Sequence, residues 1–428
     1  MNDGGTRVRA SDAALAAPGS DSVATVAAPV PETTPAPTTP VTTTPETTTL
    51  ETMTLETTTL PATTVPVTPA PDPTSPATTV APVPAAPVRA TMVFAGDVLI
   101  HDAVWRAAAI DGGYDFSPLL APVQEMISSA DLAICHMEGT LGAPGAPPSG
   151  FPRFSAPPTL AVDLKEAGFD GCSIASNHSF DRGARGVSDT IAGFESAGLA
   201  HAGSALEPGG ASSARYDVKG IAVVQLSYTY GSNGAVPAAL GHLLNIIDSA
   251  RILADAAEAR ANGAQIVVVS LHWGEEYDHN ITAAQLKVAD ALAAQPGVID
   301  LVVGHHAHVV EPIARVGDLW VAFGMGNFLS NNWAECCRNE VTDGVIVSAT
   351  IEADGNGSAH VVAVDYTPTW NGRDNYTVRL VERALIDGNS DVSAAVLRAS
   401  FDRTTAYVTG ASGEARGLPT IAAKNRPG

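Results

Sequence analysis

The sequence predicts a layered α/β domain with a mixed sheet, carried behind a long Thr/Pro-rich stalk. Residues 1–88 consist mainly of Thr, Pro, Ala and Val and contain no aromatic residue. Such a segment cannot bury enough apolar surface to offset the entropy lost on ordering it. From residue 89 onward, short Val/Ile/Leu-rich runs alternate with amphipathic segments. Strands of this composition are buried on both faces, which requires helices packed against the sheet.

These observations divide the 428-residue chain into three parts. We predict a disordered stalk over residues 1–88, a folded domain over 89–385, and a weakly structured tail over 386–428 with at most one helix, near 392–402. The stalk repeats the pentads ETTTL, ETMTL and ETTTL over residues 46–60, and Thr/Pro tracts of this kind are extended spacers. All five Trp, eight Tyr, ten Phe and four Cys follow residue 88, so the core must form there.

Hydrophobic periodicity places the elements of the folded domain. The predicted strands are 91–96, 132–135, 171–176, 221–228, 265–272, 299–304, 319–324 and 344–351. The predicted helices are 117–129, 159–167, 186–197, 248–262 and 282–294. Ser117 followed by Pro118 favours a helix start, and Thr282 favours another. The stretch 319–366 is hairpin-rich, so the sheet should be mixed.

Charge and hydropathy restrict partners and compartment. The net charge is −22 and no basic stretch offsets it, which excludes nucleic acid as a partner. No run of 18 uninterrupted apolar residues is present, so no transmembrane segment is predicted. The stalk favours an extracytoplasmic location, secreted or attached to the cell envelope. Residues 1–30 lack the continuous apolar region of a secretory signal; either the true start lies upstream of Met1 or export uses another signal.

The four cysteines leave their redox state open. Cys135 and Cys172 each lie in an apolar strand-like run, and Cys336 and Cys337 are adjacent in the chain. Neighbouring cysteines do not readily bridge each other. Two buried free thiols beside a surface pair, or one disulfide, remain as alternatives.

Polar residues follow six of the predicted strands. They are Asp97, Glu138, Asn177 with His178, His272, His306 with His308, and Asn327. The carboxyl ends of strands are where open α/β sheets build their sites, so we expect these side chains to meet. A single histidine after a strand is usually structural, but six strand ends together favour a site. Carboxylate, amide and imidazole groups are the ligands of divalent transition metals.

The ordered motifs GDVLIH, HMEGT, SNHSFDRG, HWGEEY, GHHAHV and GNF resemble those of the bacterial CapA poly-γ-glutamate capsule biosynthesis family. FSAPP and SYTYGSNG, between those motifs, resemble it too, and the likeness covers about residues 91–350. The family is similar to calcineurin-like metallophosphoesterases. The resemblance therefore implies a four-layer α/β/β/α sandwich with mixed sheets and a centre of two divalent ions, Mn, Zn or Fe.

The resemblance also implies a role for each motif residue. The first metal would be bound by Asp97 and His308, the second by Asn177, His272 and His306, and both by Glu138. His178 would contact the substrate and assist the leaving group. Asn327, Tyr230 and Asn233 are expected beside the ligands or against the substrate.

One departure affects the first metal. The phosphoesterase pattern has a histidine where this chain has Leu99. His101 is one candidate to replace it. His136 is another, because strand alternation puts it on the same face as Glu138. The competing interpretation is that His136 only replaces, as a hydrogen-bonding group, the asparagine that the family more often has at this position. A site with a single metal ion is the alternative.

Two functions fit this pattern. The first is a metal-dependent hydrolase that cleaves a small phosphoester or an amide in a cell-envelope polymer. The second is a non-catalytic accessory factor that uses its metal site to hold an anionic polymer such as poly-γ-glutamate during capsule synthesis or export. Serine-based hydrolysis is not supported, because no G-x-S-x-G motif follows a predicted strand.

Overall fold

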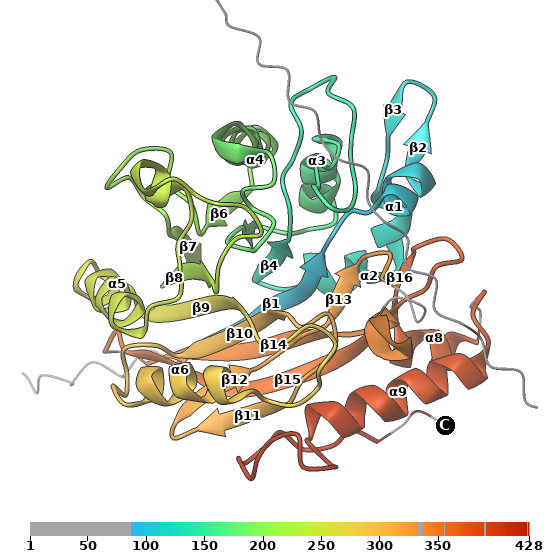
Figure 1. Ribbon diagram of the computed structural model, residues 1–428. Coiled ribbons are helices and arrows are strands. Elements are labelled where there is room, and N and C mark those ends of the chain that lie inside the picture. The colour runs from blue at the N-terminus through green and yellow to red at the C-terminus, as the bar shows by residue number, and fades with distance from the viewer. Residues whose placement is uncertain (1–86, 333–336, 355, 389–390, 426, 428) are drawn as a thin grey trace, which may run out of the picture. The chain divides into compact units, whose positions relative to one another are not determined.

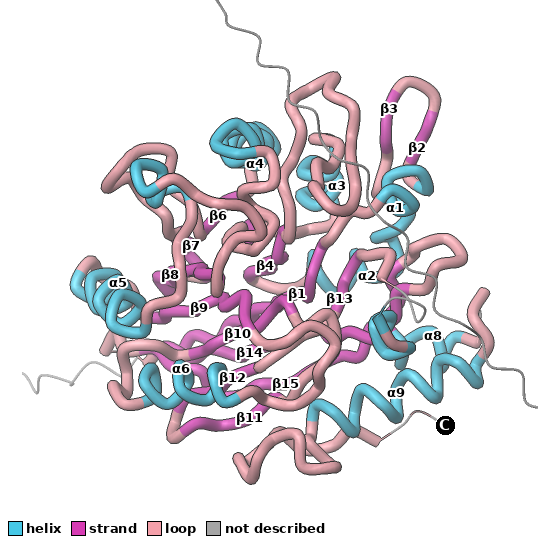
Figure 2. The backbone as a smooth tube through the Cα atoms, in the orientation of Figure 1, coloured by secondary structure: helices cyan, strands magenta, loops and turns pink. Residues whose placement is uncertain are grey.

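The computed structural model describes residues 87–332, 337–354, 356–388, 391–425 and 427. All but the last two residues of the predicted stalk lie outside the described residues, as does the pentad repeat at 46–60. The described chain contains two large β-sheets and the helices that cover them (Figures 1 and 2).

The first sheet contains β1 (Val88–Val98), β4 (Leu132–Met137), β5 (Gly171–Ser173), β6 (Ala200–Ala202), β13 (Asn327–Leu329), β14 (Asp343–Ala353), β15 (Ala359–Asn371) and β16 (Val378–Leu380). The second contains β7 (Ala214–Val218), β8 (Ile221–Thr229), β9 (Ile266–Trp273), β10 (Leu301–His306), β11 (Ile313–Val316) and β12 (Leu319–Ala322). A small hairpin pairs β2 (Ala109–Ile110) with β3 (Gly113–Tyr114).

The helices are α1 (Asp102–Ala107), α2 (Ser117–Ser128), α3 (Thr159–Glu166), α4 (Gly183–Ala197), α5 (Ser249–Ala261), α6 (Ala283–Ala293), α8 (Val381–Asp387) and α9 (Ala394–Val408), with 3-10 turns η1 (Ala238–Leu243) and η2 (Asn339–Thr342). No helix among these described residues is long and apolar enough to cross a membrane.

Both sheets are mixed, as the sequence predicts. The first has the order β16-β15-β14-β1-β4-β5-β6, with β13 also beside β1, and the second has the order β11-β12-β10-β9-β8-β7. In the first sheet β1, β4, β5 and β6 run parallel, whereas β14 and β15 form an antiparallel hairpin. In the second, β8, β9, β10 and β12 run parallel between antiparallel edge strands.

Side-chain alternation along the central strands creates the layers. On β1, Met92 and Phe94 join the core between the two sheets, whereas Val93 packs with residues of α2, α3 and α4. On β10, Val303 joins the core between the sheets, whereas Val302 packs with residues of α5 and α6. The fold is therefore a four-layer α/β/β/α sandwich, and Figure 1 shows α3 and α4 above the sheets, α5 at the left and α6 at the lower left.

A β-bulge near the end of β1 changes which way its side chains point. Phe94 pairs with Ile134 of β4, and Asp97 pairs with His136, so β1 uses three steps where β4 uses two. The extra residue reverses the alternation, and Asp97 therefore turns towards the second sheet. Gly96 allows this bend, because a Cβ there would lie 2.1 Å from the carbonyl oxygen just before β13.

The starts of α6 and α2 are stabilised in different ways. α6 is capped by a neighbouring residue, and the start of α2 is stabilised by a residue distant in the sequence. Thr282 caps α6 and forms a reciprocal capping box with Gln285, as expected from a Thr before an apolar helix. α2 begins at Ser117 itself, without a capping bond from that side chain. Its first turn is held instead by Asp163, which accepts a hydrogen bond from the Phe116 backbone N–H at 2.8 Å.

The described C-terminal residues contain one helix that begins after residue 386, as the sequence predicts. The helix predicted near 392–402 is α9, and it buries Leu397 and Phe401. Its Arg403 donates hydrogen bonds to both carboxylate oxygens of Asp343 at 2.8 and 3.0 Å. α9 packs against the neighbouring α8 and also against β14 and β15, and the latter two lie far away along the chain.

One disulfide joins neighbouring strands of the first sheet. Cys135 of β4 and Cys172 of β5 are directly opposite each other and are bonded, with Cα atoms 4.4 Å apart. Both are buried. Cys336 lies outside the described residues.

Candidate metal centre

Donor atoms from both sheets meet at the carboxyl ends of β1, β4, β9 and β10. Three groups occur among the described residues, and in each the donor atoms lie within 4.8 Å of one another. The groups are Asp97 with Glu138 and His308, Glu138 with His272 and His306, and Asp97 with His136 and His305. All of these side chains are buried. Five of the six metal ligands implied by the sequence motifs are thus brought together by the fold.

Glu138 lies at the centre of this arrangement, because the first two groups share it. Its side chain is fully buried, and neither carboxylate oxygen has a hydrogen-bond partner within the described chain. The nearest basic atoms are Nε2 of His308 at 3.5 Å and Nε2 of His272 at 3.7 Å from Oε1. Ligands about 2.0–2.2 Å from one tetrahedral ion lie about 3.3–3.6 Å apart. The spacing around Glu138 therefore fits ligands directed at a shared ion better than direct hydrogen bonds.

His308 is held in one tautomer by its neighbours. Its Nδ1 lies 3.0 Å from Oδ1 of Asn327. The Asn327 amide nitrogen donates to the carbonyl oxygens of His308 and Val341, so its oxygen must be the acceptor. His308 therefore carries a proton on Nδ1, and its Nε2 atom faces Glu138. Asn327 thus lies beside the donors, the place the sequence motifs imply for it.

His306 has one ring nitrogen without a hydrogen-bond partner among the described residues, and its backbone has a positive φ. Its buried Nδ1 has no hydrogen-bond partner among the described residues. Its φ is 89°, a value that few residues other than glycine adopt. Such strain is concentrated at functional sites, where the surrounding structure enforces it.

Asn177 joins the second group through His272. The Oδ1 atom of Asn177 lies 2.9 Å from Nε2 of His272, and both side chains are buried. An amide oxygen and an imidazole nitrogen at this separation can share a proton, or both can bind one cation. The loop after β8 lies next to them, since Asn233 donates its backbone N–H to the carbonyl oxygen of Asn177.

The cluster buries two carboxyl groups, and a nearby positive charge would stabilise both in their ionised form. Burial raises the pKa of Glu138 well above its usual range, against the opposing charge of His308. For His308, burial lowers the pKa, but Glu138 and Asp97 outweigh it and raise the value to about 10. Burial would raise the pKa of Asp97, yet hydrogen bonds from His305 and His308 hold it well below its usual range. A divalent cation supplies the positive charge that such a cluster needs.

Three buried histidines, His306, His272 and His136, are held in the neutral form that metal binding requires. Burial lowers the pKa of His306 to about 3, and the charge of His308 adds to the effect. Burial also holds the pKa of His272 and of His136 well below the usual value.

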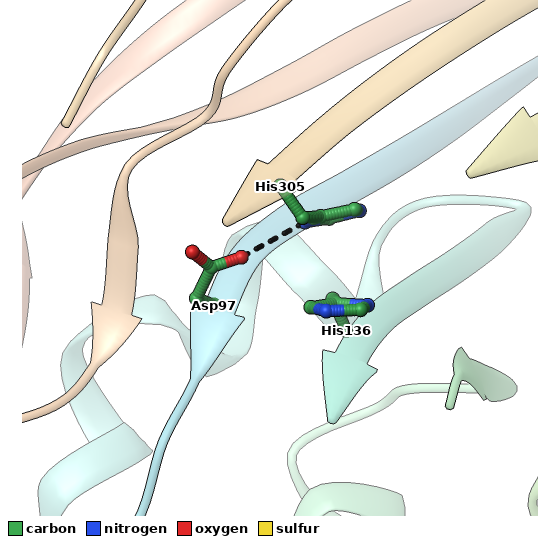
Figure 3. A group of neighbouring side chains, drawn as sticks. All are labelled: Asp97, His136 and His305. Atoms are coloured by element: carbon green, nitrogen blue, oxygen red, sulfur yellow. Dashed lines mark hydrogen bonds and ion pairs between the residues drawn. The ribbon is translucent and has the colours of Figure 1, made fainter. Parts of the chain in front are cut away.

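The third donor group differs from the first two. His305 donates Nδ1–H to Asp97 Oδ1 at 3.1 Å, and its ring lies flat on that of His136 (Figure 3). His305 is missing from the ligands implied by the sequence motifs. The signal that could have found it is side-chain alternation along β10. Leu301 and Val303 face the core between the two sheets, and His305, two residues further on, faces the same way. The predicted strand ends at residue 304, one residue too early to show this.

His178 belongs to a second set of side chains beside the donors. Its Nδ1 lies 2.8 Å from Oδ2 of Asp181, which also accepts the backbone N–H of Phe154 at 2.7 Å. Asn233 Nδ2 lies 3.2 Å from His178 Nε2. Asp181 is absent from the sequence-based site, although the i, i+3 spacing within SNHSFDRG places it beside His178. Half-exposed Tyr230 covers the ring of His306, with ring centres 4.6 Å apart.

Two positions near the first group do not contribute donors to it. Leu99 is buried in the core. His101 belongs to none of the donor groups found in the described chain. Its Nδ1 lies 3.1 Å from the carbonyl oxygen of Leu99 and 3.3 Å from the backbone nitrogen of Asn331. The structure therefore leaves the first group with three protein donors.

Comparison with known proteins gives the chain its family. It is 27% identical over 238 residues to "PGA biosynthesis protein CapA" of Bacillus subtilis (strain 168), covering 52% of this chain and 58% of that protein. It is 29% identical over 221 residues to "Capsule biosynthesis protein CapA" of Bacillus anthracis, covering 50% and 52%. The chain thus spans about half the length of the curated relatives it matches.

Among solved structures, the fold is similar to the calcineurin-like phosphoesterase YfkN from Bacillus subtilis, with 13% identity, a TM-score of 0.41, and coverage of 74% of this chain and 97% of that chain. Residues 91–332 match the family described as "Bacterial capsule synthesis protein PGA_cap". That match spans more than half of the chain, which therefore belongs to the PGA_cap family of bacterial capsule synthesis proteins.

Proposed function

We propose that this chain is a metal-dependent hydrolase of capsule synthesis, with two divalent ions (Mn, Zn or Fe) held around Glu138. The observation that carries the proposal is the Glu138 carboxylate, which is fully buried and has no hydrogen-bond partner within the described chain. Burying an ionised carboxylate without compensation costs several kcal/mol or more. A bound cation removes that cost.

The two donor groups define the proposed ligands. Asp97, Glu138 and His308 would hold one ion, and Glu138, His272 and His306, joined by Asn177, would hold the other. Three protein donors with an open position are typical of catalytic rather than structural metal sites. The absence of a donor at Leu99 is therefore compatible with catalysis and does not require replacement by His101.

His178 and Asp181 supply the proton chemistry. A carboxylate can only accept, so His178 carries a proton on Nδ1 and gives it to Asp181 in a hydrogen bond of 2.8 Å. This orients the ring. When Nε2 is protonated as well, His178 would transfer that second proton from Nε2 to the leaving group and keep the Nδ1 proton. The divalent ions, when bound, supply activation of water and stabilisation of the charge that develops on the substrate.

The proposed substrate is a cell-envelope compound, either poly-γ-glutamate or a related anionic polymer cleaved at its amide bonds, or a small phosphoester. The family and the names of two relatives support a capsule polymer. The net charge of −22 would repel a polyanion at long range, and bound divalent ions would offset this locally.

We place the protein outside the cytoplasm, at the cell envelope. The disulfide between Cys135 and Cys172 supports this location, since disulfides persist in oxidising compartments and are rare in the cytosol. Thiol labelling of cell fractions, before and after reduction, tests the location. A protein with free thiols at both positions in cells would contradict it.

The function is tested by metal analysis of the full chain, followed by hydrolysis assays with bis-p-nitrophenyl phosphate, p-nitrophenyl phosphate and poly-γ-glutamate. Glu138→Gln should lose metal and activity. Glu311→Gln is the matched control, because Glu311 is equally buried but belongs to none of the donor groups in the described chain. Wild-type protein that binds no divalent ion would overturn the proposal. Metal-dependent binding of poly-γ-glutamate without any hydrolysis would replace it with the accessory-factor function.

A further inference from the structure

Four side chains form a square between the two sheets, and two of them, Asp97 and His272, are proposed ligands. Asp97 and His136 are register partners on β1 and β4, and His305 and His272 are register partners on β10 and β9. Each pair faces the other across the core. His305 Nδ1 contacts Asp97 Oδ1 at 3.1 Å, and His136 Nε2 contacts His272 Nδ1 at 2.9 Å. Two hydrogen bonds therefore cross between the sheets at the same level.

The rings of His136 and His305 are stacked, and this geometry excludes a cation shared between them. Their centres lie 3.9 Å apart and their planes differ by 16° (Figure 3). An imidazole lone pair lies in the plane of its ring. Two nearly parallel stacked rings cannot both direct lone pairs at one ion at about 2.0–2.1 Å. Both ring nitrogens of His136 are also engaged, Nδ1 by Ser173 Oγ at 2.8 Å and Nε2 by His272.

We propose that His136 and His305 are positioning residues, each of which fixes one ligand of the two-ion centre. His305 holds Oδ1 of Asp97. The other oxygen, Oδ2, accepts the His306 backbone N–H at 3.2 Å and keeps a second lone pair for the ion shared with His308. His136 accepts the Nδ1 proton of His272, which leaves the Nε2 lone pair of His272 for the second ion. This inference rests on the proposed two-ion function and replaces the expectation that His136 is itself a ligand.

The hydrogen-bond chain behind His272 has a direction that a bound cation fixes. A cation at Nε2 of His272 leaves the proton on Nδ1, which must then be donated to His136. His136 in turn donates Nδ1–H to Ser173, whose hydroxyl donates to the carbonyl oxygen of Cys135 at 3.4 Å. Every member of this chain is buried, so the protons cannot rearrange with solvent. Outer partners of this kind set both the tautomer and the orientation of a metal-binding histidine.

His136 contacts its ligand through Nε2, whereas His305 contacts its ligand through Nδ1. A different substitution should therefore restore the hydrogen bond at each position. The side-chain amide of an asparagine reaches about as far as Nδ1 of a histidine, and that of a glutamine reaches about as far as Nε2. In His136→Gln the new amide oxygen can accept the His272 proton, whereas in His136→Asn the side chain is too short. In His305→Asn the new amide nitrogen can donate to Asp97, whereas His305→Gln places the amide too far out.

The test titrates Zn²⁺ and Mn²⁺ into the full chain and measures stoichiometry and affinity by calorimetry. We expect His136→Ala and His136→Asn to weaken the second ion by about 10–100-fold and His136→Gln to restore most of the affinity. We expect His305→Ala and His305→Gln to weaken the first ion by a similar factor, with rescue by His305→Asn. Wild-type affinity in all six variants overturns the inference. Complete loss of one ion in His136→Gln makes His136 a ligand and also overturns it.

A measurement on the unmutated protein keeps the test independent of variant folding. In the Zn²⁺-loaded chain labelled with ¹⁵N-histidine, NMR should report both His136 and His305 protonated on Nδ1. A zinc-shifted nitrogen in either ring overturns the inference. If the wild type binds no ion at all, the proposed function fails instead, so the two failures are distinguishable.

Discussion

Asn327 accepts the Nδ1 proton of His308 at 3.0 Å while its own amide nitrogen is committed to two backbone carbonyls, those of His308 and Val341. The amide cannot flip without losing all three hydrogen bonds. The amide oxygen of Asn327 can therefore only accept a hydrogen bond from His308, and this bond fixes the orientation of the His308 ring.

Replacing Asn327 by Ala should weaken binding of the ion held by Asp97, Glu138 and His308 by about 10–100-fold, because His308 loses its outer partner. Binding of the second ion should change little. Metal titration of both variants checks this, with Asn371→Ala as the control. Asn371 is another buried asparagine that bonds backbone groups on both sides. Equal loss of affinity in the two variants would show that the effect is general destabilisation.

Asp181→Asn should lower kcat while leaving metal content unchanged. The substitution removes the negative charge that holds His178 Nδ1–H at 2.8 Å, so the ring loses its fixed tautomer. General acid catalysis contributes about 10²–10⁴-fold, and the loss should approach that range. The loss should be smaller for nitrophenyl substrates than for alkyl esters, because a good leaving group needs no proton. A loss independent of the leaving group would contradict the role given to His178.

Glu311→Gln should flatten the dependence of stability on pH. Burial raises the pKa of Glu311 well above its usual value, and the hydrogen bond from Gln285 only partly opposes this. Between the unfolded and the folded pKa, the folded state binds the extra proton. Stability of the wild type should therefore fall as pH rises through this window, by up to about 1.4 kcal/mol per pH unit.

Urea unfolding at pH 5 to 8 measures this slope. The glutamine variant stays neutral and should lose less stability over the same range. The same substitution at Glu125, which is exposed on α2, serves as the control. Parallel curves for the wild type and Glu311→Gln would show that Glu311 ionises normally in the folded chain.

Breaking the disulfide should destabilise the domain. The free energy of unfolding of a double Cys135→Ala, Cys172→Ala variant should be about 2–4 kcal/mol lower than that of the oxidised wild type. The bond joins residues with a sequence separation of 37, so its loss releases a loop of that length in the unfolded chain. Reductant should lower the melting temperature of the wild type more than that of the variant. Non-reducing peptide mapping checks the pairing, and a wild type insensitive to reductant would contradict the prediction.

Sequence patterns predict much of this fold because its central strands carry strong local signals. Runs such as IVVVSLHW in β9 are apolar on both faces, so each strand can be placed without knowing its neighbours. The polar residues that end β1, β4, β9 and β10 can also be placed, since strand ends in layered α/β folds converge on one edge.

What sequence patterns miss depends on contacts between distant segments. The bulge that turns Asp97 towards the second sheet follows from pairing with β4, and only Gly96 hints at it. The role of His136 depends on His272 and His305, which come from the other sheet. The order of α9 depends on Asp343, to which Arg403 binds.

The donor set is divided between two sheets, and this has a consequence for folding kinetics. Asp97 and His305 are 208 positions apart in the chain, and His136 and His272 are 136 apart. Loops of this size must close before the donors can meet, and contacts of such long range form slowly. A half-formed chain therefore offers either the two carboxylates and Asn177 of the first sheet or the ligand imidazoles of the second, with weak affinity for any cation. Uptake of Zn²⁺ during refolding should therefore lag behind the formation of helices. Its rate should report the rate at which the two sheets dock.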